Sequence, residues 1–232
     1  MKYTPKEIEE NVNISPISPV RDFLELVIKI FGVILVIYIG LGLLVDYIAP
    51  RISIEMELKL GRIFSAEFEK RKPLEKEAEM QAILEDLLKH ADYLPGFHYK
   101  INIKESKQVN AAALPGGQIV IFSALLKEID SKNEAALVLA HELGHFVHRD
   151  HLRGLGRSLI FLTLSSVLFG ADSSVTKFIT NSISNVEMRF SQSREKAADI
   201  YALDLLNKTY GNVSGAVDFF KKMAAKDRIG PF

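Results

Sequence analysis

Residues 131–148 read SKNEAALVLAHELGHFVH, and this stretch decides the fold of the chain. Its apolar residues recur at helical spacing, and Ser131 followed by Glu134 is typical of a capping box at a helix start. We therefore expect one helix from Glu134 to about His148. Residues 141–145, HELGH, form the pattern H-E-x-x-H, which places two imidazoles four residues apart on one helical face. Two such imidazoles can reach one metal ion.

Glu142 lies between these histidines and is placed to hold a reacting water rather than the metal itself. A catalytic zinc site needs a third protein ligand and one open position. The chain contains no cysteine, so this ligand must be histidine, aspartate or glutamate. The same absence excludes disulfides, thiolate nucleophiles, zinc fingers and iron–sulfur clusters.

Two residues compete for the third ligand position. His151 lies ten residues after His141, as in the extended motif H-E-x-x-H-x-x-G-x-x-H, but His148 occupies the glycine position of that motif. Glu195 lies farther along, in a helical pattern of about residues 186–206, and shares a helical face with Asp199. We favour Glu195 as the ligand and expect Asp199 to bond a ligating imidazole and fix its tautomer.

The segments around these motifs predict an α+β fold that is mainly helical, with a small β-sheet. Residues 74–90 have the spacing of an amphipathic helix. Residues 97–103 alternate as a half-buried strand does, and residues 118–123 follow a Pro-Gly-Gly turn as a second strand. We assign residues 73–232 to this domain.

An apolar segment at residues 23–49 precedes the domain and predicts one transmembrane helix. Its stretch from Ile30 to Val45 carries no charge, and about 20 helical residues cross a hydrocarbon layer of about 30 Å. Residues 1–22 read as a polar tail and residues 50–72 as a juxtamembrane connector. The basic residues flanking the segment are balanced, so its orientation stays open. We prefer the extracytoplasmic (periplasmic) side for the domain, which a chain without cysteine permits.

A second apolar run, Leu159–Phe169, has 11 residues and is too short to cross a bilayer by itself. It reads either as a helix or hairpin of the soluble domain or as an element at the membrane surface. The formal net charge of the chain is zero, which argues against a nucleic-acid-binding protein. Nothing in the sequence indicates an oligomeric state.

Three segments together resemble a known family. Residues 110–117 (NAAALPGG), 141–145 (HELGH) and 195–199 (EKAAD) look like the three signatures of the HtpX-like and CAAX-prenyl-endopeptidase-type zinc metallopeptidases, in the same order. The resemblance covers roughly residues 75–210. It implies a gluzincin-type, zincin-like fold, one Zn²⁺ per chain and endopeptidase activity, and many such relatives are membrane-anchored and act in protein quality control.

The resemblance also implies a substrate strand just before the active helix, because zincin relatives use an edge strand there to bind an extended peptide. We expect this role for residues 118–123, through Gln118, Ile119, Val120 and Ile121.

The leading hypothesis is a single-pass, membrane-anchored zinc endopeptidase with membrane lipid and polypeptide substrates as partners. His141, His145 and Glu195 hold Zn²⁺, while Glu142 takes the proton of the attacking water and delivers it to the leaving amine. One alternative is a catalytically weak zincin that serves as a membrane-bound scaffold or chaperone. Glu142 argues against it, since a scaffold does not need that carboxylate. Another is a soluble enzyme whose N-terminal helix packs on a partner.

Overall fold

The computed structural model describes residues 18–69, 75–174, 176–177, 191–215, 218–219 and 221–222. The chain divides into two units, Met1–Leu41 and Gly42–Phe232. Most of the first unit's described residues belong to helix α1 (Pro19–Ile48), none of whose side chains is buried. With a mean hydropathy of 2.6 over its most apolar window, this helix is long and apolar enough to cross a membrane. The helix begins at Pro19, so the predicted polar tail ends earlier than residue 22.

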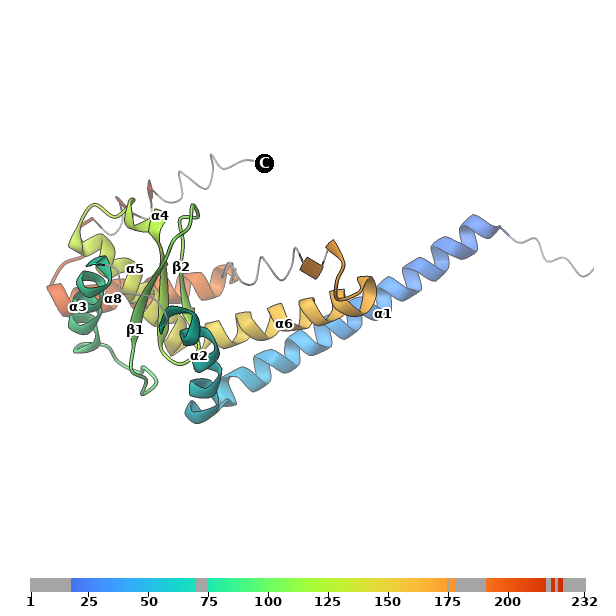
Figure 1. Ribbon diagram of the computed structural model, residues 1–232, viewed down its shortest axis with the longest axis horizontal. Coiled ribbons are helices and arrows are strands. Elements are labelled where there is room, and N and C mark those ends of the chain that lie inside the picture. Colours follow the sequence, from blue (N-terminus) through green and yellow to red (C-terminus); the bar gives the residue numbers. More distant parts are fainter. Residues whose placement is uncertain are drawn as a thin grey trace, which may run out of the picture. The chain divides into compact units, whose positions relative to one another are not determined.

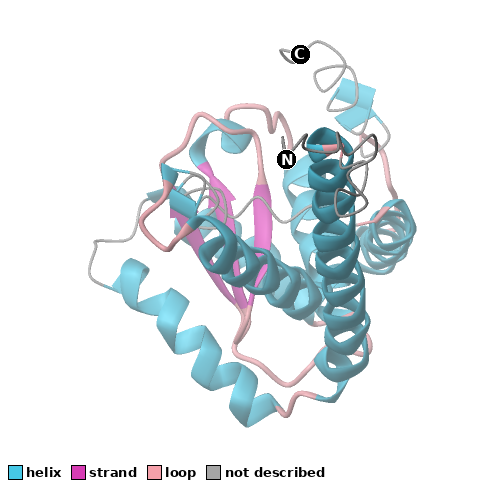
Figure 2. Cartoon of the chain, turned by 90° about the vertical axis from the view of Figure 1, so that its right-hand side faces the viewer, coloured by secondary structure: helices cyan, strands magenta, loops and turns pink. Residues whose placement is uncertain are grey.

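The second unit contains a three-stranded sheet in the order β1-β3-β2 (Figures 1 and 2). Strand β1 (Lys100–Lys104) pairs in parallel with β3 (Gln118–Phe122), and β2 (Ala111–Leu114) pairs antiparallel with β3. Gly116 and Gly117 join β2 to β3 with φ angles of 76° and 80°, a conformation that glycine adopts at little cost. The two predicted strands are confirmed, although β1 begins three residues later than expected. The sequence did not predict β2, whose alanines lack the β-branched character of most strands.

Helices pack around this sheet. They are α2 (Ile54–Glu69), α3 (Glu75–Leu88), α4 (Ser123–Leu126), α5 (Lys132–Val147), α6 (Asp150–Phe169) and α8 (Gln192–Tyr210), with a 3₁₀ turn at Ala49–Arg51. Helix α5 lies at the centre, against α3, α8 and β2, and most of its side chains are buried. The main core is built from apolar side chains of α3, α5, α8 and the sheet, including Leu84, Leu87, Ile119, Ile121, Leu139, Leu143, Phe146, Leu205 and Leu206.

The outer edge of β1 is covered by two side chains of α3. The backbone N–H of Ile101 donates to Gln81 Oε1 at 2.9 Å, and that of Ile103 donates to Glu77 Oε1 at 2.6 Å. Glu77 and Gln81 are one helical turn apart, so they meet the same edge. The sheet therefore has one edge bonded to a helix and a second edge at β2.

The second apolar run belongs to a longer helix than the sequence indicated. Helix α6 has 20 residues because it begins at Asp150, well before Leu159. By length and composition, α1 and α6 are the two helices among the described residues that could cross a membrane. The shortness of the apolar run therefore does not exclude α6 from the membrane, and a single span is not established.

Candidate metal centre

Helix α5 begins at Lys132, two residues before the predicted start, and Ser131 is its N-cap residue. Ser131 Oγ accepts a hydrogen bond from the backbone N–H of Glu134 at 3.2 Å, and the Glu134 carboxylate accepts one from the backbone N–H of Asp130 at 2.9 Å. The first bond satisfies a donor that the first helical turn leaves without a partner, and the second joins the residue before the N-cap to the helix. The helix continues to Val147, so both histidines of the H-E-x-x-H pattern lie on its last three turns.

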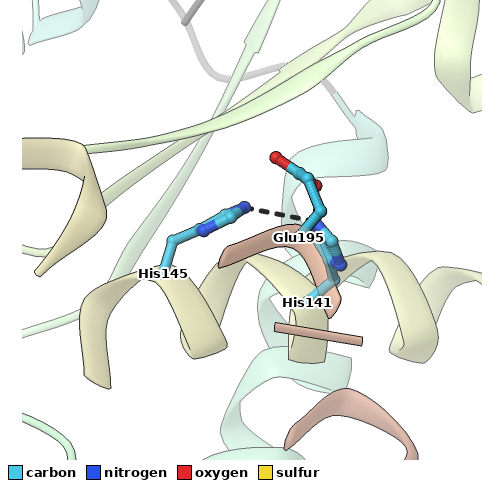
Figure 3. A group of neighbouring side chains, drawn as sticks. All are labelled: His141, His145 and Glu195. Atoms are coloured by element: carbon cyan, nitrogen blue, oxygen red, sulfur yellow. Dashed lines mark hydrogen bonds and ion pairs between the residues drawn. The ribbon is translucent and has the colours of Figure 1, made fainter. Parts of the chain in front are cut away.

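His141, His145 and Glu195 lie together, with the glutamate supplied by the first turn of α8 (Figure 3). His141 Nε2 lies 3.2 Å from His145 Nε2 and 3.3 Å from Glu195 Oε2. The donor atoms of the three side chains all fall within 4.8 Å of one another. Ligand atoms at zinc–ligand distances around a tetrahedral ion are about 3.4 Å apart, so this donor set fits zinc.

A carboxylate orients each of the two imidazoles. His141 Nδ1 lies 2.9 Å from Asp199 Oδ1, and His145 Nδ1 lies 3.4 Å from Asp150 Oδ2. A proton on Nδ1 that is donated to a carboxylate leaves Nε2 as the lone-pair nitrogen that a metal needs. Asp199 thus lies where the sequence predicts, whereas the role of Asp150 was missed.

The chain turns sharply between α5 and α6, and this turn explains where Asp150 and His151 lie. Arg149 has a φ of 56°, the left-handed conformation that glycine favours, and its guanidinium donates to the Ile52 carbonyl and to Glu57. Asp150 follows directly and faces back to His145. The sequence predicts the end of the helix at about His148, and no local pattern in it indicates that Asp150 returns to His145.

His151 is fully buried away from the metal-ligand group. Its Nε2 lies 2.6 Å from Glu57 Oε1 of α2, and its Nδ1 lies 3.3 Å from the backbone carbonyl of His145. Both ring nitrogens therefore have partners that hold α2 against the end of α5. Of the two candidate third ligands, the structure brings Glu195 and not His151 to the histidine pair.

The electrostatics of the group favour a cation. Burial lowers the pKa of His141, but hydrogen bonds to Asp199 and Glu195 and the charge of Glu142 outweigh it and raise the pKa to about 10. Three carboxylates around one imidazole stabilise positive charge at that place. A divalent metal ion meets the same requirement.

Close packing between α5 and α8 sets the distance from the histidines to Glu195. A Cβ atom on Gly144 would lie 2.9 Å from the Cα atom of Ala198 and 3.2 Å from its Cβ atom. The two helices thus meet at a glycine and an alanine, one turn from the ligands on either side. Larger side chains at this crossing would separate the helices.

A cleft of about 80 Å³ opens over the metal-ligand group. One part of the cleft is lined by β2 and the residue before it, namely Asn110, Ala111, Ala112 and Ala113. The rest is lined by His141, Glu142, His145 and Glu195. Glu142 is buried, with 6% of its surface exposed, yet its side chain reaches this cleft.

The strand beside the cleft is β2, so the predicted substrate strand was wrong. Gln118, Ile119, Val120 and Ile121 belong to β3, which is the central strand and already pairs with β1 and β2. A strand that is already hydrogen-bonded to a strand on each side has no free edge at which a substrate peptide could pair. The order of strands in the sheet caused the error, since sequence proximity to α5 suggested β3.

The register of β2 determines which of its peptide groups face outward. The backbone N–H of Phe122 donates to the Asn110 carbonyl at 3.0 Å, which makes these residues a hydrogen-bonded pair. Bonded and non-bonded pairs alternate along an antiparallel ladder, so the peptide groups of Ala111 and Ala113 point away from β3. The Asn110 side chain already accepts from the N–H of Ala111 at 3.0 Å. The N–H and the carbonyl of Ala113 therefore point away from β3, while the residue itself is buried, with 2% of its surface exposed.

Comparisons with known proteins agree with this geometry. A sequence profile described as Peptidase family M48 matches residues 74–227. The chain is 35% identical over 116 residues to the mitochondrial metalloendopeptidase OMA1 of Arabidopsis thaliana, a match that covers 49% of this chain and 23% of that protein. It is 27% identical over 146 residues to the beta-barrel assembly-enhancing protease of Yersinia pestis, with 57% and 29% covered.

A shorter relative is the metalloprotease LoiP of Escherichia coli, to which the chain is 29% identical over 132 residues, covering 55% of this chain and 51% of LoiP. The matched part thus spans 23% to 51% of the length of these curated relatives.

Proposed function

The chain belongs to peptidase family M48, and on that premise we propose that it is a zinc-dependent endopeptidase that hydrolyses peptide bonds in polypeptide substrates. One observation carries the proposal: the donor atoms of His141, His145 and Glu195 lie within 4.8 Å of one another. Glu142 lines the same cleft, within reach of a substrate placed there. The names of the relatives, which are metalloendopeptidases and metalloproteases, support the same activity.

In this proposal His141 and His145 bind Zn²⁺ through Nε2, and Glu195 binds it through a carboxylate oxygen. When bound, zinc supplies a Lewis acid that polarises the substrate carbonyl and lowers the pKa of water toward neutrality. Asp199 and Asp150 hold the two imidazoles in the required tautomer. Glu142 accepts the proton of the attacking water and passes it to the leaving amine.

The outer edge of β2, which lines the cleft, is where we place the substrate backbone. An extended peptide can add to a sheet edge by main-chain hydrogen bonds. The N–H and the carbonyl of Ala113 point away from β3 at this edge, and the strand lines the cleft that contains Glu142. A peptide bound along β2 therefore passes over the metal-ligand group. The other edge, at β1, is bonded to Glu77 and Gln81.

We further propose that α1 anchors the enzyme in a membrane, with lipid around its exposed apolar side chains. Protein quality control is the cellular role that this combination suits, since a membrane-anchored endopeptidase with a backbone-binding edge recognises extended chains more than particular side chains. The extracytoplasmic side is our choice for the domain. The scaffold alternative has less support, because Glu142 lies in the cleft, where a scaffold has no use for a carboxylate.

The test is proteolysis by the full chain in detergent. We expect cleavage of casein that stops with o-phenanthroline and returns when Zn²⁺ is added back. A chain that binds one Zn²⁺ and cleaves neither casein nor unfolded polypeptides would favour the scaffold instead.

A further inference from the structure

Asp150 is a buried carboxylate that touches the metal-ligand group and two arginines. Its side chain is 1% exposed, and its Oδ2 lies 3.4 Å from His145 Nδ1. Its Oδ1 lies 3.2 Å from an Arg153 guanidinium nitrogen and 3.4 Å from Arg194 Nε. A buried carboxylate is costly unless its charge is balanced and its oxygens are hydrogen-bonded. The position of Asp150 at His145 thus depends on these arginines.

Arg194 extends from Asp150 to the end of α1. Its Nη2 lies 3.0 Å from Asp46 Oδ1, while its Nε faces Asp150. Asp46 belongs to the last turn of α1, and Arg194 directly precedes Glu195 in the first turn of α8. The guanidinium of Arg194 therefore contacts both Asp46, at the end of α1, and Asp150, the carboxylate beside His145. Arg194 is also the residue directly before Glu195, the candidate third metal ligand.

The neighbouring arginines do not make the same connection. Arg157 binds Asp46 at 2.5 Å and has no described bond to Asp150. Arg153 binds Asp150 at 3.2 Å, but its Nε is 3.9 Å from Asp46, at the limit of an ion pair. Among the residues that the structure describes, Arg194 is thus the arginine with a contact of 3.4 Å or less to both carboxylates.

We propose that Arg194 is a positioning residue that links Asp46, at the end of α1, to the metal centre through Asp150. The link keeps the Asp150 carboxylate at His145 Nδ1 and fixes the turn of α8 that carries Glu195. Ser191, the N-cap residue of α8, makes no side-chain cap bond. The described contacts of this turn include those of Arg194 to Asp46 and Asp150 and that of Glu195 to His141. The affinity for zinc then depends on Asp46, a residue outside the site. This inference requires that the chain binds zinc as the proposed function states, but it does not require that the chain cleaves peptides.

The experiment measures zinc affinity of the full chain in detergent by competition with a chromophoric chelator. Loss of an outer partner of a metal-binding histidine weakens metal binding by about 10–100-fold. Arg194→Met removes a partner of Asp150 and leaves Asp150 itself in place, so we expect a loss at the lower end of this range, about tenfold. Arg157→Met is the matched control, because it also removes an arginine from Asp46 but no bond to Asp150, and it should stay within about twofold of wild type. Co²⁺ in place of Zn²⁺ gives a second readout, since its visible spectrum reports ligand geometry and should change in Arg194→Met alone.

Asp46→Asn tests the connection to α1. We expect weaker zinc binding than wild type, and the double variant with Arg194→Met should be no weaker than Arg194→Met alone, since both break one network. Asp46→Asn also carries the test if Arg194→Met does not fold, as judged by circular dichroism. Wild-type affinity in Arg194→Met or Asp46→Asn would overturn the proposal, as would equal losses in Arg194→Met and Arg157→Met. A wild-type chain that binds zinc and cleaves nothing would remove the proposed activity and leave this inference standing.

Discussion

Gly144 of α5 lies against Ala198 of α8 with no room for a side chain between them. This contact fixes how far Glu195 stands from the histidine pair, because the ligands lie within one helical turn of the crossing on each helix. The proposed metal centre therefore depends on the distance between two backbones as well as on the proposed ligands themselves.

Gly144→Val should force the two helices apart. Overpacking of this kind costs about 1–3 kcal/mol, and the separation of Glu195 from His141 should weaken zinc binding by at least about tenfold. Thermal unfolding and zinc competition measure the two effects. Gly96→Val is the control, since a Cβ atom there meets nothing within 4 Å. Unchanged zinc affinity in Gly144→Val would contradict the role of the crossing.

Glu142→Gln should keep zinc bound and abolish proteolysis. The amide has nearly the shape of the carboxylate but cannot take a proton, and loss of a general base costs about 10²–10⁴-fold in rate. Metal analysis and a casein assay on the same preparation measure both quantities. Cleavage at the wild-type rate would refute the assignment of Glu142 as the base.

Glu195→Ala and His151→Ala should differ in metal content. Glu195→Ala removes a proposed ligand and should lose zinc, as measured by elemental analysis after dialysis. His151→Ala removes the bond to Glu57 and should lower the free energy of unfolding by about 3–5 kcal/mol while zinc stays at one per chain. Retained zinc in Glu195→Ala together with its loss in His151→Ala would reverse the ligand assignment.

Ala113→Pro should weaken substrate binding at the edge of β2. Its N–H points away from β3, so proline removes an outward donor without removing a ladder bond. Loss of one hydrogen bond to an extended peptide should raise KM about tenfold. Zinc content should be unchanged, which separates this effect from damage to the metal centre. A KM equal to that of wild type would place the substrate elsewhere.

The stability of the metal-free chain should fall as pH rises from about 6.5 to about 10. The folded chain holds the pKa of His141 at about 10, above its ordinary value of 6.5, through Asp199 and Glu195. A raised folded pKa contributes stability that is complete below pH 6.5 and is lost as pH approaches 10. Thermal unfolding with a chelator present measures the trend, and His141→Gln should flatten it. A rise in stability over this window would show that His141 is not protonated in the folded chain.

The sequence predicted the elements that depend on local patterns. The H-E-x-x-H helix and its capping residue Ser131 follow from spacing within one helix, as does the shared face of Glu195 and Asp199. Features that depend on tertiary structure were missed. The order of the strands made β3 central and left β2 at the cleft, and the left-handed residue Arg149 returned Asp150 to His145. The order of strands in a sheet and the conformation of one turn residue produce no periodic pattern in the sequence, so they could not be predicted from it.

The bonds of Glu77 and Gln81 to β1 have a consequence for solubility. Exposed sheet edges are where proteins aggregate, because any extended chain can pair with them. Here α3 occupies one edge, so an unfolded chain that approaches the sheet has only β2 to pair with among the described strands. At β2 it meets the proposed catalytic centre. Under the proposed function, the edge among the described strands at which this protein could start to co-aggregate with a misfolded chain is also the place where that chain is cut.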